Sequence, residues 1–494
     1  MINVITSKGL SEPGGSASMT IGSHATRDVR ASVRTATGPW RFQLHANAFD
    51  TDNHRDNFQR QERNVLARAT WAEASTLWSL QLGGQSAQGG LPGGITPADF
   101  FSNPQKTYKP RDAGQSEKRN VLLSGEMPAG DWRMGLDLSR RMDDTDSSYI
   151  ADGYSTQSKT RAKRVSARLW KDFGQGEVRQ RLLLGADFER WSQNRDLGDT
   201  LVEQASDAFY ARHELELRPM GLKVSAGLRQ TQAARDIRGS AVGSLEADNT
   251  SWDFGAAVKS GERGEWFARL GTSFRLPNAD EFACYPYPSG PDCPPVTLLK
   301  PQTSSDKELG YREQFAQGRW SVRYYRSDLK NEIGYDPNLG NTNFDPTRRE
   351  GLELEGNTMW GKSVEVGAQF ARRSAVFRSG DYVGKTVPMV PTQTLTARIG
   401  YRLTENRRLA LATQWVSAQR ITEDFNNSCA VQIPSYAVTN LRYSEKVQDW
   451  TLAASILNLA DRQYYNYRTM CSASLKSVYP EAGRTFMLSA QRHF

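Results

Sequence analysis

The chain has 494 residues, of which 38% are hydrophobic and 24% are charged, and its formal net charge is +8. No run of 18 apolar residues is present, which excludes a transmembrane helix. The arginines alternate with apolar residues instead of forming basic blocks, so the charge does not indicate nucleic-acid binding. No nucleophile elbow and no glycine-rich loop between a strand and a helix occurs, so we expect no enzyme and no catalytic residue.

Segments in which apolar and polar residues alternate recur from about residue 16 onward. Clear examples lie at 29–34, 164–169, 209–218 and 395–402. A period of two predicts β-strands with one apolar and one polar face, and runs of about ten residues can cross hydrocarbon when tilted. A β-propeller would show a repeat of about 40–50 residues, which is missing here, and a β-sandwich rarely has so many long strands.

The connections between these segments are of two kinds. Tight turns are expected at 37–39, 127–130, 173–176, 218–221 and 317–318. Long polar loops are expected at 84–117, 142–160, 232–249, 276–303 and 458–483. Short periplasmic turns and long extracellular loops are typical of outer-membrane proteins. We therefore predict an all-β fold, a transmembrane antiparallel β-barrel of about 22 strands.

The last eleven residues, 484–494, form one of these predicted strands. Phe486, Leu488 and Phe494 lie on its apolar face, which only Arg492 interrupts. A chain that ends on an aromatic residue of a strand is expected where the last strand pairs with the first and closes a barrel. Arg492 is tolerable there if it lies near the membrane interface and extends its guanidinium toward water.

The four cysteines form two local pairs in stretches outside the alternating segments. They are Cys284 with Cys293 and Cys429 with Cys471. An even number of cysteines confined to loops predicts disulfides formed in an oxidising compartment. A four-thiolate zinc site would need closer C-x-x-C spacing, so we expect no metal site and no cofactor.

Six segments, in this order, resemble characteristic stretches of the TonB-dependent outer-membrane receptors of siderophore-receptor type. The segment at 2–6 resembles the last strand of that family's N-terminal plug, and 273–281 resembles its FRAP box. The others resemble the LKPE(T/R)S stretch, the RRxGxExE strand, the NLFDKxYY stretch and the start of the terminal strand, and they lie at 299–304, 349–356, 457–465 and 483–485.

The resemblance implies two domains: residues 1–9 as the last strand of a plug, and residues 10–494 as the barrel. We find no signal peptide, TonB box or remaining plug in this sequence, which suggests a truncated gene product. Family members work with the TonB–ExbB–ExbD system. The receptor segment that docks with this system is not found in this sequence. A barrel of this width without a plug is expected to be an open pore.

The resemblance also implies a monomer in the outer membrane of a Gram-negative bacterium, surrounded by lipid and lipopolysaccharide. The implied ligand is a ferric siderophore or a similar iron chelate. Cobalamin, another small nutrient and free diffusion through a porin-like channel remain alternatives. Haem is disfavoured because 276–300 contains no histidine. The acidic stretch 143–146 could hold Ca²⁺, but its spacing is not that of an EF-hand, and a solvated loop is the better interpretation.

Aromatic and basic residues of the expected outer loops are the candidate ligand contacts, because such side chains bind anionic iron chelates. They are Trp191, Arg195, Tyr285, Tyr287 and Tyr382.

Other residues of the six segments have an architectural interpretation. Glu353 and Glu355 should face the lumen and pair with arginines of neighbouring strands. Tyr464 and Tyr465 should belong to the aromatic girdle at the membrane interface.

Overall fold

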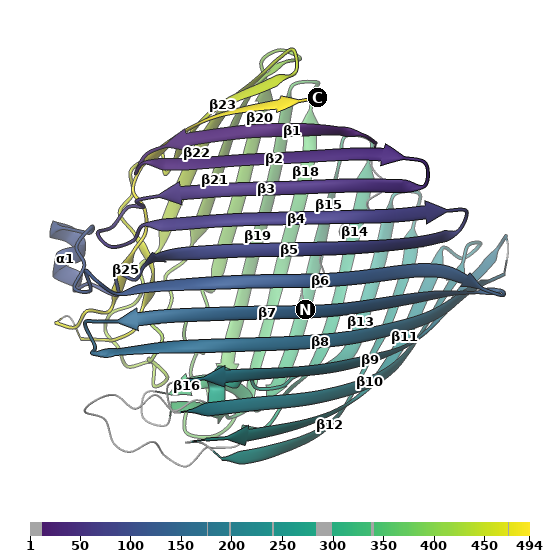
Figure 1. The fold of residues 1–494 in the computed structure, drawn as a ribbon, viewed down its shortest axis with the longest axis horizontal. Coiled ribbons are helices and arrows are strands. Elements are labelled where there is room, and N and C mark those ends of the chain that lie inside the picture. Colours follow the sequence, from purple (N-terminus) through teal and green to yellow (C-terminus); the bar gives the residue numbers. More distant parts are fainter. Residues whose placement is uncertain are drawn as a thin grey trace.

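The structure, a computed structural model, describes residues 12–174, 176–196, 199–239, 242–282, 299–336, 340–472 and 474–494. Within them, 22 antiparallel strands form one closed sheet, as predicted. Each strand pairs with its neighbours along the chain, and Figure 1 shows them wrapped into a barrel. The plug strand expected within residues 1–9 lies outside the described residues.

The barrel strands are β1 (Gly14–Gly22), β2 (Thr26–Thr37), β3 (Trp40–Thr51), β4 (Arg60–Glu73), β5 (Thr76–Gly90), β6 (Ala113–Ala129), β7 (Trp132–Tyr149), β8 (Tyr154–Phe173), β9 (Val178–Arg195), β10 (Thr200–Leu217), β11 (Leu222–Arg238), β12 (Gly243–Ser260), β13 (Gly264–Arg275), β14 (Gln302–Phe315), β15 (Gly318–Lys330), β18 (Thr347–Trp360), β19 (Val364–Phe377), β20 (Gln393–Arg402), β21 (Arg407–Val416), β22 (Tyr436–Val447), β23 (Trp450–Leu457) and β26 (Thr485–His493).

The last strand closes the barrel. β26 pairs antiparallel with β23 on one side and with β1 on the other. The backbone N–H of Gly15 donates to the carbonyl oxygen of Phe494 at 2.6 Å. This is the closure that the alternation in 484–494 predicts, and it satisfies the backbone groups of both terminal strands.

The outer face carries a band of exposed apolar side chains in the middle of the strands. Examples from around the barrel are Val29, Leu44, Leu82, Phe209, Leu270, Leu354, Ile399 and Leu488. Toward the loops the outward residues become charged, as in the ion pair of 2.9 Å between Arg63 and Asp50. An apolar belt that gives way to charge matches the hydrocarbon and headgroup layers that a bilayer-spanning barrel meets.

Short turns join the strands at one end, called the turn end (Figure 1). The other end, called the loop end, carries the long connections together with short ones such as 23–25 and 150–153. The strands reverse near all five predicted turns, although the turn expected at 127–130 lies at 130–131 because β6 extends to Ala129. At 37–39 the tight reversal places Gly38 at φ 54°. Such a positive φ favours glycine because a side chain there is strained.

Of the five loop predictions, those at 142–160 and 232–249 are wrong. β7 and β8 extend to Tyr149 and from Tyr154, and β11 and β12 extend to Arg238 and from Gly243. The ends of β7 and β8 are polar on both faces, so the sequence there resembles a loop. Cross-strand contacts hold them together: Asp146 on β7 accepts hydrogen bonds from Gln115 at 3.0 Å and Gln157 at 2.6 Å. The acidic stretch 143–146 is therefore strand, not the expected loop.

Small elements cover the loop end. They are the helix α1 (Pro97–Ser102), the 3-10 helix η1 (Ala279–Phe282), and two ribbons made of β16 (Glu332–Asp336) with β17 (Gly340–Phe344) and β24 (Tyr465–Arg468) with β25 (Val478–Pro480). Thr96 caps α1, and its Oγ1 accepts from the Asp99 N–H at 3.1 Å. Within the described residues, no helix is long and apolar enough to cross a membrane.

Tyr465 does not belong to an aromatic girdle, contrary to the prediction. It is 8% exposed and packs edge-on against Phe100 of α1, with ring centres 5.1 Å apart. The two rings lie in an apolar cluster at the loop end together with Ile95, Ile421, Ile433 and Val478. The connection after β23 folds back onto α1, so this tyrosine is buried by the loops and not by lipid. Its neighbour Tyr464 is half-buried, and its ring lies tilted against that of Tyr436 with ring centres 4.6 Å apart.

Candidate functional site

The inner wall of the barrel carries arginines paired with carboxylates. Asp187 on β9 is 7% exposed, and its Oδ2 lies 3.2 Å from Arg164 on β8 and 2.7 Å from Arg229 on β11. The strand register brings the three side chains to one face, where each arginine lies at most two strands from Asp187. Two arginines neutralise a carboxylate that would otherwise be costly to bury.

The pairing continues along the wall. Arg168 binds Asp137 at 2.7 Å. Arg323 on β15 contacts Glu353 on β18 and lies 3.6 Å from Glu308 on β14. The predicted lumenal position and arginine partner of Glu353 are thus confirmed. Such a wall is hydrophilic and rigid.

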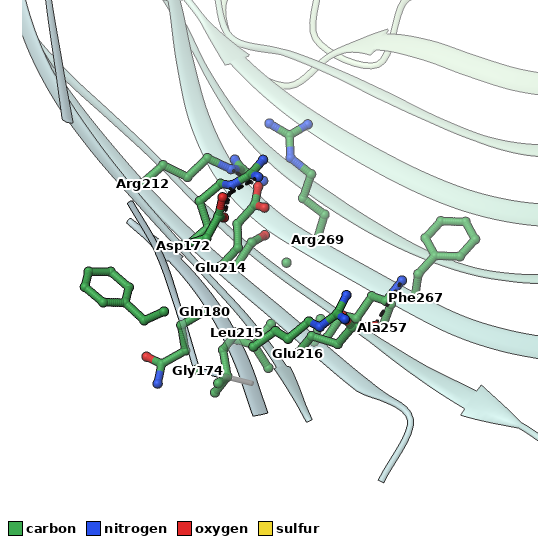
Figure 2. Close-up of a pocket in the computed structure, with 18 of the residues that line it drawn as sticks. Asp172, Gly174, Gln180, Arg212, Glu214, Leu215, Glu216, Ala257, Phe267 and Arg269 are labelled. Atoms are coloured by element: carbon green, nitrogen blue, oxygen red, sulfur yellow. Dashed lines mark hydrogen bonds and ion pairs between the residues drawn. The ribbon is translucent and has the colours of Figure 1, made fainter. Parts of the chain in front are cut away.

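A cavity of about 910 Å³ opens against this wall at the turn end of β8–β14. Figure 2 shows the side chains of Asp172, Arg212 and Glu214 gathered together, with Arg269 extending into the same space. Arg212 donates to Glu214 at 2.9 Å and to Asp253 at 3.0 Å. Arg269 has no ion-pair partner in the part of the chain that the structure describes. The cavity offers both signs of charge to a polar occupant.

A second cavity, of about 660 Å³, lies at the loop end. We call it the loop-end cavity; it is lined by His24, His54, Phe100, Phe101, Pro104, Gln105, Ala460, Asp461, Arg462, Gln463, Glu481, Gly483 and Arg484. Phe101 is 74% exposed. Arg462 and Arg484 are exposed and form no ion pair among the described residues. Two guanidinium groups that form no ion pair among the described residues, beside two phenyl rings, suit a planar or anionic ligand.

Ionisable groups of this cavity have shifted pKa values. Burial raises the pKa of the Glu481 carboxyl and lowers that of the His54 imidazole. Burial, together with the charge of Glu481, raises the pKa of nearby Tyr464 to about 12. The two arginines of the cavity share its lining with the carboxyl groups of Asp461 and Glu481.

Among the described candidate ligand residues, Trp191 and Arg195 lie on β9 and Tyr382 lies in a different part of the structure. Trp191 packs into an apolar cluster with Val202, Ile237, Leu299 and Ile333, under the guanidinium of Arg235 at 5.3 Å. Arg195 ends β9.

Tyr382 lies in a different cluster. Its ring stacks on Phe425 at 5.4 Å and contacts Phe377 at 5.5 Å. Tyr285 and Tyr287 lie outside the described residues. Trp191 and Tyr382 thus pack into apolar clusters. The role of the five candidates as ligand contacts remains a proposal.

The structure joins Cys429 to Cys471 by a disulfide, with Cα atoms 5.7 Å apart. Cys284 and Cys293 lie outside the described residues. Arg468, 3% exposed, donates to the carbonyl oxygens of Met470 at 3.0 Å and Cys471 at 3.2 Å. These contacts fasten the connection after β23 beside the loop-end cavity. No group of three or more His, Cys, Asp or Glu side chains in the described ranges is placed to hold a metal ion.

Sequence reasoning missed the residues of the loop-end cavity and also Arg235. Arg235 lies in 232–249, which was expected to be a loop, so its alternation with Ala234 and Asp236 was not used. His24, His54, Phe100 and Arg462 come from four different connections. Nothing in their local spacing shows that they meet.

A comparison with protein-family models matches residues 17–459 to the family described as TonB dependent receptor-like, beta-barrel. The chain belongs to this family. It is a family of transport receptors, and the match covers most of the barrel strands described above.

Solved structures share the fold at low sequence identity. The ferric-catecholate import receptor Fiu from E. coli K12 is 16% identical with a TM-score of 0.79, over 98% of this chain and 82% of that one. The ferric citrate transporter FecA is 15% identical with a TM-score of 0.84, over 98% and 79%. The copper transporter OprC is 14% identical with a TM-score of 0.79, over 98% and 80%. These similarities show a shared fold.

Proposed function

We propose that the chain is the barrel of an outer-membrane receptor that imports a ferric siderophore or a similar iron chelate. The observation that carries the proposal is the closed 22-stranded barrel of the TonB-dependent receptor family. Several structural neighbours are named as receptors for iron chelates. Energy for import would come from the TonB–ExbB–ExbD system that the family name implies, and the receptor would act as a monomer surrounded by outer-membrane lipid.

The loop-end cavity is the proposed place of first contact with the chelate. Ferric chelates of the catecholate and carboxylate classes are anionic, and catecholates add flat aromatic rings. Arg462 and Arg484 supply unpaired positive charge, and Phe100 and Phe101 supply apolar ring faces. Arginine binds carboxylates and similar planar anions through paired N–H groups, which gives direction as well as charge.

Binding to the full chain in a neutral detergent tests this assignment. Titration calorimetry would compare a ferric catecholate, ferric citrate, a ferric hydroxamate, cyanocobalamin and Cu²⁺. We expect an iron chelate to bind, and the variant Arg462→Gln/Arg484→Gln to bind it about tenfold or more weakly. The charge-matched control Arg319→Gln/Arg402→Gln changes two exposed arginines at the turn end and should bind normally.

Other outcomes would overturn the proposal. Binding of only cobalamin or only Cu²⁺ would assign a different cargo to the same barrel. No binding of any ligand, together with steady single-channel conductance in a planar bilayer, would indicate a diffusion channel. Equal binding by the loop-end variant and its control would show that the loop-end cavity does not contact the ligand.

A further inference from the structure

Three cations lie side by side on the outer face of the barrel, directly beyond the apolar band. The register places Arg140 of β7 opposite Lys163 of β8, and Lys163 opposite Arg190 of β9. All three are exposed. The neighbouring outward positions toward the turn end are the exposed apolar residues Leu138, Val165 and Phe188, which form the same kind of row. We call the three cations the cation row.

The cation row is short of negative charge. Arg190 binds Asp207 of β10 at 2.5 Å, on the side away from Lys163. Arg140 and Lys163 have no carboxylate partner within the described residues. Like charges directly opposite each other on a sheet are destabilising. One carboxylate for three adjacent cations leaves an excess that an external anion would relieve.

The next outward positions toward the loops differ in this respect. Arg119 binds Glu117 at 3.0 Å, and Arg161 binds Asp144 at 2.5 Å. Each of these arginines therefore has its own carboxylate. The uncompensated charge is confined to the level at which apolar side chains end, which is the level of lipid headgroups in a spanning barrel.

We propose that the cation row binds a phosphate group of a phosphorylated lipid in the leaflet nearest the loops. Arginine and lysine are the side chains that bind phosphate most strongly, and basic groups at a membrane surface attract anionic lipids. The acyl chains of that lipid would lie along Leu138, Val165 and Phe188. The inference rests on the membrane placement in the proposed function and on no assumption about the imported ligand.

Another part of the outer face, on β14 and β15, supplies a matched control. Lys307 of β14 lies opposite Arg326 of β15, also one outward position beyond an exposed leucine, Leu309. There Arg326 lies opposite Glu350 and binds Asp328 at 3.0 Å. Arg348 of β18 also binds Asp328, at 2.7 Å, so two carboxylates serve three cations here, compared with one for the three cations of the cation row. This pair therefore has less excess charge to offer a phosphate.

Native mass spectrometry of the full chain in a neutral detergent tests the proposal. The probes are diphosphoryl lipid A, phosphatidylethanolamine and inorganic phosphate. We expect Arg140→Gln/Lys163→Gln to bind diphosphoryl lipid A about 30-fold more weakly than the unaltered chain, from the contribution of two basic groups near a lipid phosphate. Lys307→Gln/Arg326→Gln should change binding less than threefold.

Several results would overturn the proposal: equal effects of the two double variants, equal binding of phosphatidylethanolamine, or inorganic phosphate bound as tightly as the lipid. Heat-dependent gel mobility would show that each variant is folded. If the double variant does not fold, Lys163→Gln alone and the salt dependence of lipid A binding by the unaltered chain decide the question, because phosphate pairing weakens with salt. Iron-chelate binding should be unchanged in the cation-row variant, so failure of the import proposal would be seen separately.

Discussion

The guanidinium carbon of Arg492 lies 5.8 Å from the ring centre of Trp450, its register partner where β26 pairs with β23. Arg492 is the one cation on the otherwise apolar outer face of β26, two residues from the C-terminus. The tryptophan ring covers its charge next to the turn that joins β22 to β23. The arrangement explains how the closing strand carries a cation at the edge of the apolar band.

A double-mutant cycle should measure this contact. We expect Arg492→Met and Trp450→Leu to show a coupling free energy of about 0.5–1 kcal/mol, as for a cation–π pair at an exposed site. Denaturant unfolding of the folded barrel in lipid bilayers provides the free energies. If the effects of the two substitutions on the unfolding free energy are additive, Arg492 and Trp450 do not stabilise each other.

Asp187 should contribute strongly to the stability of the inner wall. Asp187→Asn leaves Arg164 and Arg229 facing each other across a buried amide, and we expect a loss of about 1.5–3 kcal/mol of unfolding free energy. The control is Asp207→Asn on the outer face, whose exposed pair with Arg190 should contribute less than about 1 kcal/mol. Similar losses in both variants would show that burial of Asp187 has no special role.

The disulfide between Cys429 and Cys471 should stabilise the loop end locally. The two cysteines are 42 positions apart in the sequence. Cys429 packs against the cluster that contains Tyr465. In Cys429→Ser/Cys471→Ser we expect faster hydrogen exchange at 421–433 and 465–480, with about 2–4 kcal/mol less protection. The rate of hydrogen exchange in β8–β12 should be the same as in the unaltered chain. Faster exchange throughout the barrel would contradict a local role.

Acidification should loosen the contact between the β3–β4 loop and the connection before β26. Burial lowers the pKa of His54, whose Nε2 lies 3.0 Å from the Pro480 carbonyl oxygen. The folded loop therefore binds fewer protons on this ring than the unfolded chain does, so stability falls as the pH falls below about 6.5.

Hydrogen exchange of residues 52–59 at pH 7.5 and pH 5.5 measures this effect. His54→Gln, which cannot titrate, should remove the difference between the two pH values. The control His213→Gln lies on β10, outside the loop end, and should keep the difference. A pH response that survives in His54→Gln would assign the effect to another group.

The sequence predicted the barrel because the period of two depends only on which residues face lipid. The closing strand at 484–494 and the lumenal Glu353 followed from that pattern alone. Strand length did not, since β7 and β8 become polar on both faces beyond the apolar band and then resemble loops.

Packing at the loop end was also hidden in the sequence. Tyr465 and Tyr382 sit in polar stretches, and alternation cannot show that loops from distant parts of the chain bury them. The cation row depends on the register between β7, β8 and β9, which fixes Arg140 opposite Lys163. Local spacing in one strand contains no information about its neighbour's register.

Iron uptake by living cells tests the import proposal most directly. The full-length gene product would be expressed in Gram-negative cells that lack their other iron receptors, and cell-associated radioactive iron would be counted after adding a ferric siderophore. The account predicts accumulation that a protonophore abolishes and that Arg462→Gln/Arg484→Gln reduces about tenfold. Uptake that is absent for every chelate, or that continues at the same rate with the protonophore, would contradict it.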